Sequence, residues 1–168
     1  MTVGRRNDPV AGFNFAVTLL DSPAAAGSGI ATISVGALLG GASAGFSECT
    51  GLEMTLDLEE YQEGGRNGTV LQFPTRVQWN PITLKRGIAT NRDLVDWFQG
   101  FVEGRGRRKN GVITLRDADG RAHTAWTFRR GLPRRWSGPS LNAAQSQVAI
   151  ESIEITHEGL YTLPGVTS

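Results

Sequence analysis

Hydrophobic and polar residues alternate along several short segments of the chain, which is the pattern of half-buried strands. The clearest case is Leu52–Glu59, where Leu and Met residues alternate with acidic or polar ones. We expect its leucines to pack on the core and its acidic side to face water. Residues 13–20 alternate in the same way, and residues 31–37 predict a further short strand.

Breaks in this alternation predict turns. The segment Tyr61–Thr69 contains three glycines and Asn67 and therefore predicts a protruding turn or an extended hairpin loop. Val77 and Trp79 share one face of the next strand, and Asn80-Pro81 then shifts the phase before Ile82. Because proline cannot donate a hydrogen bond to a sheet, we expect a bulge or a sheet edge at this point.

One segment, Thr90–Gly104, has helical periodicity. Thr90 and Asp93 fit a capping box, Gly104 suits the position just after the helix, and the apolar residues recur at spacings of three and four. The pattern predicts a helix that packs an aromatic face on a sheet.

The C-terminal third of the chain again predicts strands. Residues 111–115 and 122–128 should form a hairpin around Asp117–Gly120, and the segment Gln147–His157 should form the last strand, with a bulge between Ile150 and Ile153. About seven strands and one helix predict a mainly β protein: an antiparallel β-sandwich or barrel with one packed α-helix.

Length and composition restrict the class of protein and the number of domains. The 168 residues, 22 of them glycine, suit one domain spanning 1–168. Cys49 is the only cysteine, which excludes an intrachain disulfide and any zinc-ligand spacing. The chain shows no secretory signal and no membrane anchor, so we expect a cytoplasmic, soluble protein.

The net charge of +1 conceals two opposed blocks. Residues 48–63 carry six acidic residues and no basic one, whereas residues 105–135 carry ten basic residues against Asp117 and Asp119. Of the 17 basic residues, 15 are arginine. Protein interfaces favour arginine over lysine, although a GC-rich genome would produce the same bias.

The chemistry of an enzyme is missing from the sequence. His123 and His157 read as surface or turn residues, and Cys49 has no basic neighbour in sequence that would activate its thiol. The acidic row of Glu53, Asp57 and Glu59 is either a metal-binding group or a solvated or partner-facing side of a strand. We therefore expect a non-enzymatic protein without cofactor or metal.

The basic run 105–109 supports two functions. It could neutralise phosphates in a monomeric, β-rich nucleic-acid-binding module. It could instead be a solvated loop, or the docking surface for the acidic block of a neighbouring copy. Because the two blocks have opposite sign, a head-to-tail contact between copies is the economical interpretation, and such contacts close into rings or grow into filaments.

Several motifs resemble the tube proteins of contractile phage tails, a family that includes the inner tubes of extracellular contractile injection systems. The resemblance runs from about residue 8 to residue 161 and rests on motifs that occur in the family's order. They are Asp8-Pro9, Phe13-Asn14-Phe15, Ala44–Glu48, Gly51-Leu52-Glu53, Tyr61–Asn67 (YQEGGRN), Ile82–Gly87 (ITLKRG), Trp97-Phe98, Asn110-Gly111, Gly138-Pro139, Leu141-Asn142, Ile150-Glu151 and His157-Glu158-Gly159.

The resemblance implies a β-sandwich that assembles into hexameric rings, which stack into a hollow tube inside a contractile sheath. Partners would be further copies, sheath, baseplate and spike proteins, with DNA or a protein effector as cargo in the channel. Assembled in the cytoplasm, the chain would become part of a phage tail or of a released or cell-associated injection particle. The residues expected to join subunits, from the resemblance and from the charge blocks, are Glu59, Glu60, Tyr61, Glu63, Gly64, Arg66, Lys85, Arg86, Arg105, Arg107 and Arg108.

One segment departs from the family pattern. Residues 21–43 insert about twenty uncharged, Gly/Ala-rich residues where the family has a short turn. Such an insert would suit an adaptor to a different neighbour. The sequence thus leaves open a main tube subunit, a paralogous one, or a specialised ring near the baseplate.

Overall fold

A computed structural model of the chain describes residues 12, 14–22, 45–61, 70–88, 91–142, 144 and 148–163. These residues form nine strands and one helix, so the mainly β prediction is confirmed. The elements are β1 (Phe15–Asp21), β2 (Glu48–Thr50), β3 (Met54–Tyr61), β4 (Leu71–Trp79), β5 (Ile82–Gly87), α2 (Asp93–Val102), β6 (Lys109–Arg116), β7 (Ala122–Ser137), β8 (Ile150–Thr156) and β9 (Leu160–Leu163). The strand predicted at 31–37 lies outside the described residues.

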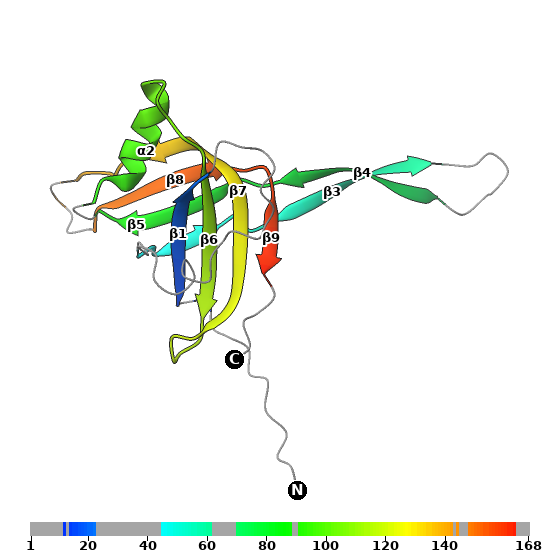
Figure 1. Ribbon diagram of the computed structural model, residues 1–168, viewed down its shortest axis with the longest axis horizontal. Coiled ribbons are helices and arrows are strands. Elements are labelled where there is room, and N and C mark those ends of the chain that lie inside the picture. Colours follow the sequence, from blue (N-terminus) through cyan, green and yellow to red (C-terminus); the bar gives the residue numbers. More distant parts are fainter. Residues whose placement is uncertain are drawn as a thin grey trace, which may run out of the picture.

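The body of the subunit is an antiparallel sheet in the order β1-β6-β7-β8-β5-β2, with β9 paired to β7 (Figure 1). The long strand β7 joins two layers. Its first part pairs with β6 and β9, and its last part pairs with β8. Between the parts, Arg130 has a positive φ of 51°, and its amide is held by Asn110 Oδ1 at 2.8 Å. The chain bends at Arg130, so the two parts of β7 lie in the two layers of the predicted sandwich or barrel.

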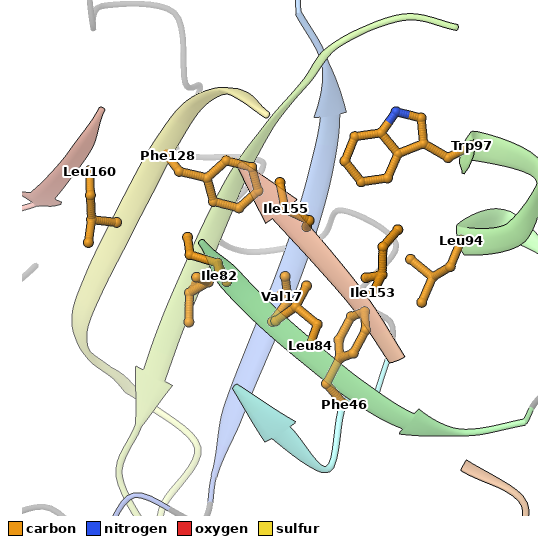
Figure 2. Packing of buried hydrophobic residues seen from close by; sticks show 11 residues of the cluster. Val17, Phe46, Ile82, Leu84, Leu94, Trp97, Phe128, Ile153, Ile155 and Leu160 are labelled. Carbon is orange, nitrogen blue, oxygen red and sulfur yellow. The ribbon is translucent and has the colours of Figure 1, made fainter. Parts of the chain in front are cut away.

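The core fills the space between these layers and under the helix. Leu84, Ile153 and Phe128 are fully buried there, and α2 adds Leu94 and Trp97 from one side (Figure 2). Each such side chain contributes about 1.5–3 kcal/mol of transfer free energy when it leaves water. The prediction that the helix packs an apolar face on a sheet is confirmed.

The C-terminal end of α2 lies where the sequence predicts it, and the N-terminal end does not. Gly104 follows the last helical turn with φ 73°, as predicted, because a residue without Cβ tolerates this conformation. The capping residue predicted at Thr90 lies outside the described residues, and the helix begins at Asp93, with Arg92 in the N-cap position. The side chain of Asn91 accepts the amide of Asp93 at 3.0 Å.

The predicted bulge near Ile150 is also wrong. β8 pairs with β5 in regular register, and its core positions are Glu151, Ile153 and Ile155, whereas Ile150 is exposed. A buried acidic residue therefore takes the position at which an apolar one was expected. β9, which completes the sheet after a short turn, was not predicted.

The hairpin of β3 and β4 is a separate two-stranded sheet that extends away from the body (Figure 1). We call it the arm. At its root, Gly51 has φ +85°, and a Cβ there would lie 2.0 Å from the carbonyl oxygen of Pro81. The phase shift at Asn80-Pro81 is thus neither a bulge nor an edge within one strand, because here the chain leaves the arm and enters β5 of the body.

Candidate assembly surface

The half of the arm next to the body carries an apolar face that is about half exposed in the part of the chain that the structure describes. Met54, Leu56 and Leu58 are 56%, 50% and 51% exposed, and Val77 lies opposite Leu56 in the strand pairing. The prediction that the leucines of this strand pack on the core is confirmed for Leu52, which packs against the core cluster, and is wrong for Leu56 and Leu58. The alternation predicts the strand correctly, but β3 belongs to the arm, so these two leucines lie outside the layers of the body.

The opposite face of the same half is polar and satisfied within the arm. Asp57 accepts hydrogen bonds from Gln78 at 2.6 Å and from Arg76 at 3.3 Å, and Glu53 accepts one from Asn80 at 2.6 Å. These carboxylates are engaged with donors of the partner strand. Among the described residues, no group of three or more His, Cys, Asp or Glu side chains is placed to hold a metal ion.

The far half of the arm combines aromatic and acidic side chains. Tyr61 and Phe73 are more than half exposed and pack edge to face, with ring centroids 6.5 Å apart. Glu59 lies opposite Phe73, and Glu60 lies opposite Gln72. The predicted residues Glu63, Gly64 and Arg66 fall in the loop 62–69, outside the described residues.

The basic run lies at the connection from α2 to β6, which is held against the helix. The indole of Trp97 donates to the backbone oxygen of Arg107 at 2.8 Å. Arg105 forms an ion pair with Glu103, which lowers the pKa of that carboxyl, and Arg108 pairs with Glu158 at 3.0 Å. The connection is therefore held to the helix by Trp97, and two of its three arginines are already paired with acidic residues of the same subunit, whereas Arg107 is exposed.

The two predicted residues of β5 have different environments. Lys85 is partly exposed and pairs with Glu48 at 2.9 Å. Arg86 is only 3% exposed and donates to Glu151 at 2.7 Å and to the backbone oxygen of Asn91 at 3.1 Å. Trp136 donates to the same carboxylate at 3.0 Å. The Arg86 side chain thus stabilises the interior, and it cannot present itself at a subunit surface as we predicted.

The structure does not bring the acidic and basic blocks together within one subunit. The arm points away from the body, whereas α2 and its basic connection lie on the body (Figure 1). None of the ion pairs formed by the described residues joins the arm to residues 105–108. In the described part of the chain, the acidic end of the arm and the basic connection are therefore separate surfaces.

Burial disfavours the charged form of two side chains that could do chemistry, the Cys49 thiol and the His157 imidazole. Burial raises the pKa of the Cys49 thiol to about 11, so the reactive thiolate is disfavoured. His157 lies in the short turn between β8 and β9, which is one of the two predicted positions, and it is half-buried. Its Nε2 donates to the backbone oxygen of Asn80 at 3.1 Å. Burial lowers the pKa of this imidazole.

The profile of the family described as T4-like virus tail tube protein gp19 matches residues 11–161. The chain belongs to this tail tube protein family. None of the curated proteins matches it. No helix of this tail tube protein, in the part of the chain that the structure describes, is long and apolar enough to cross a membrane.

Solved structures share the fold of this tail tube protein. A chain of the anti-feeding prophage baseplate, 6-fold symmetrised, is 24% identical, with a TM-score of 0.77, over 94% of this chain and 97% of its own. A chain of the extended PVC sheath-tube complex, an extracellular contractile injection system, is 20% identical, with a TM-score of 0.74, over 94% and 93%. An Hcp protein, at 8% identity, has a TM-score of 0.52 over 87% and 90%.

The family decides between the two functions that the basic run left open. A tail tube protein is a structural component of a phage tail or a related particle, and the prediction of a tail tube subunit is confirmed. The alternative of a monomeric nucleic-acid-binding module is not supported.

Proposed function

We propose that six copies of this chain close into a ring and that the rings stack into the hollow inner tube of a contractile machine. The exposed apolar face of the arm carries this proposal. A two-stranded hairpin is at best marginally stable alone in water, and single chains rarely expose a contiguous apolar surface without a partner. A second copy that covers the arm supplies the missing layer.

The proposed partners follow from this assembly. The complexes that contain the similar chains are a baseplate, a sheath-tube complex and a cap. By analogy, the tube meets sheath, baseplate and spike proteins, and its channel passes DNA or a protein effector. The chain acts without catalysis, assembles in the cytoplasm, and ends in a phage tail or an injection particle.

Negative-stain microscopy and analytical ultracentrifugation of the purified protein test the proposal. We expect rings or tubes at high protein concentration. A chain that remains monomeric, alone and with the baseplate or spike proteins of its own gene cluster as a template, would contradict it.

Charge reversal tests how the copies meet. The variant Glu59→Lys/Glu60→Lys should prevent tube growth while the circular dichroism spectrum of the subunit stays unchanged, because both side chains lie on the exposed end of the arm. Adding Arg105→Glu/Arg107→Glu to the same chain should restore tubes by re-forming the pairs with reversed sign. The control, Asp119→Lys at an exposed position of the β6–β7 turn, should assemble normally. Normal tubes from the first variant would remove the charge contact from the proposal.

A further inference from the structure

The arm changes its apolar face half-way along its length. In β3, even-numbered positions up to Leu58 are apolar, two acidic residues follow, and the next apolar residue is the odd-numbered Tyr61. In β4, the register shifts opposite Asp57/Leu58, which leaves Thr75 as an extra residue. Both strands therefore switch face at the same height.

Two apolar patches result, and they lie on opposite faces of the ribbon. The base patch next to the body consists of Met54, Leu56, Leu58 and Val77. The tip patch consists of Tyr61, Leu71 and Phe73. Side chains directly opposite each other in an antiparallel pair share a face, which fixes this assignment.

In each half of the arm, hydrogen-bonded polar side chains lie on the face opposite the apolar patch. Behind the base patch lie Asp57, Arg76 and Gln78, bonded to one another. Behind the tip patch lie Glu60 and Gln72, with 3.4 Å between the amide nitrogen and the carboxylate. Because the apolar side chains of the two halves lie on opposite faces, a surface that packs on the base patch does not reach the tip patch by continuing along the same face. A bulge also increases the local twist, which separates the patches further.

The body offers two exposed surfaces that match the two patches. Where β5 ends and β8 begins, Ile88, Val148 and Ile150 are exposed and the Ile88 amide donates to Ala149, which makes an apolar surface. At the end of α2, Val102 is 67% exposed and leads into the basic connection, where Arg107 is exposed. The three described side chains of the first surface are apolar, like those of the base patch. The second pairs an apolar residue with positive charge, which complements the aromatic and acidic tip.

We infer that the arm binds two different copies of this chain, one on each face. The base patch packs on the apolar surface at Ile88, Val148 and Ile150 of the neighbour in the same ring. The tip patch reaches the end of α2 and the basic connection of a copy in the adjacent ring. This assignment rests on the proposed function and gives it two separable contacts. The base patch has more apolar side chains and adjoins the body, so its contact closes the ring.

One charged substitution on each face tests the inference. Leu56→Glu should give monomers only, whereas Phe73→Glu should give ring-sized particles that do not stack. The controls place a charge at the same height on the opposite face: Thr55→Glu for the base and Gln72→Lys, which lies opposite Glu60, for the tip. Both controls should form tubes, as judged by negative-stain microscopy and sedimentation.

Variants of the receiving surfaces complete the test. Ile150→Glu should reproduce the monomers of Leu56→Glu, and Val102→Glu should reproduce the unstacked rings of Phe73→Glu. If Leu56→Glu and Phe73→Glu give the same product while the parent chain forms tubes, one neighbour covers both faces and the inference is overturned. Assembly of either variant into normal tubes would overturn it too. A parent chain that never assembles would instead refute the proposed function.

Discussion

The body and the arm contain the same kind of strand and give it opposite environments. Leu84 of β5 and Leu58 of β3 both alternate with polar residues, yet Leu84 is fully buried and Leu58 is 51% exposed. The body provides a second layer for its strands, whereas β3 and β4 form a separate two-stranded sheet among the described residues. Period-two alternation therefore reports that one face of a strand is apolar, and it does not report which molecule covers that face.

The largest effect on subunit stability should come from the buried ion pair of the body. Arg86→Met removes the cation and leaves Glu151 buried with the Trp136 indole as its remaining side-chain donor. We expect a loss of about 3–5 kcal/mol in the free energy of unfolding. Urea unfolding in a Leu56→Glu background measures it, because that background should keep the protein monomeric.

Two further variants show whether burial causes this loss. Lys85→Met changes the neighbouring residue, whose ion pair with Glu48 is exposed, and should cost no more than about 1 kcal/mol. The double variant Arg86→Met/Glu151→Leu removes both charges and should recover most of the stability. Equal losses from Arg86→Met and Lys85→Met would contradict the distinction between interior and surface.

A matched pair of leucine substitutions measures the difference between the two regions directly. Leu84→Ala should lower the free energy of unfolding by about 2–5 kcal/mol, since it leaves a cavity in the core. Leu58→Ala should change it by no more than about 0.5 kcal/mol, because the side chain touches water in the lone subunit. The same Leu58→Ala change should weaken assembly. Similar unfolding costs for the two variants would show that the arm packs on its own body.

The smallest effect concerns pH. Burial holds the folded-state pKa of His157 below the usual value of about 6.5, so the unfolded chain takes up a proton first as the pH falls. The stability that this neutral histidine contributes is complete above pH 6.5 and declines below it. Urea unfolding between pH 7.5 and 5 should show that decline, and His157→Gln should flatten it. The exposed His123 provides the control variant, His123→Gln, which should keep the decline.

The sequence predicted elements better than it predicted their surroundings. The strand β3, the hairpin of β6 and β7, and the end of α2 at Gly104 follow from local periodicity and turn chemistry. The bulge expected in β8 was wrong because Glu151 occupies a core position, paired with Arg86 from a strand 65 residues away. Such a pair is fixed by tertiary packing, and local pattern cannot reveal it.

The candidate surface was only partly predictable for the same reason. Glu59, Glu60 and Tyr61 stood out by charge and by motif, and they lie on the exposed end of the arm. The base patch was assigned to the core, because an apolar strand face has the same pattern whether its own chain or a neighbour covers it. The consecutive acids Glu59 and Glu60 interrupt the period-two alternation of β3. This interruption indicates that the apolar side chains change face at that point of the strand.

The uncovered arm also has a consequence for the time between synthesis and assembly. Every newly made subunit exposes a strand pair with apolar side chains, which is the kind of segment that aggregates with the wrong molecules. The acidic residues Glu53, Asp57, Glu59 and Glu60 lie between or beside these side chains. Asp57 is already paired with Arg76 in the arm, so the repulsion that opposes the stacking of arm on arm comes mainly from Glu59 and Glu60, and a basic surface relieves it. The same charges thus act as gatekeepers against misassembly while the subunit waits for its partner.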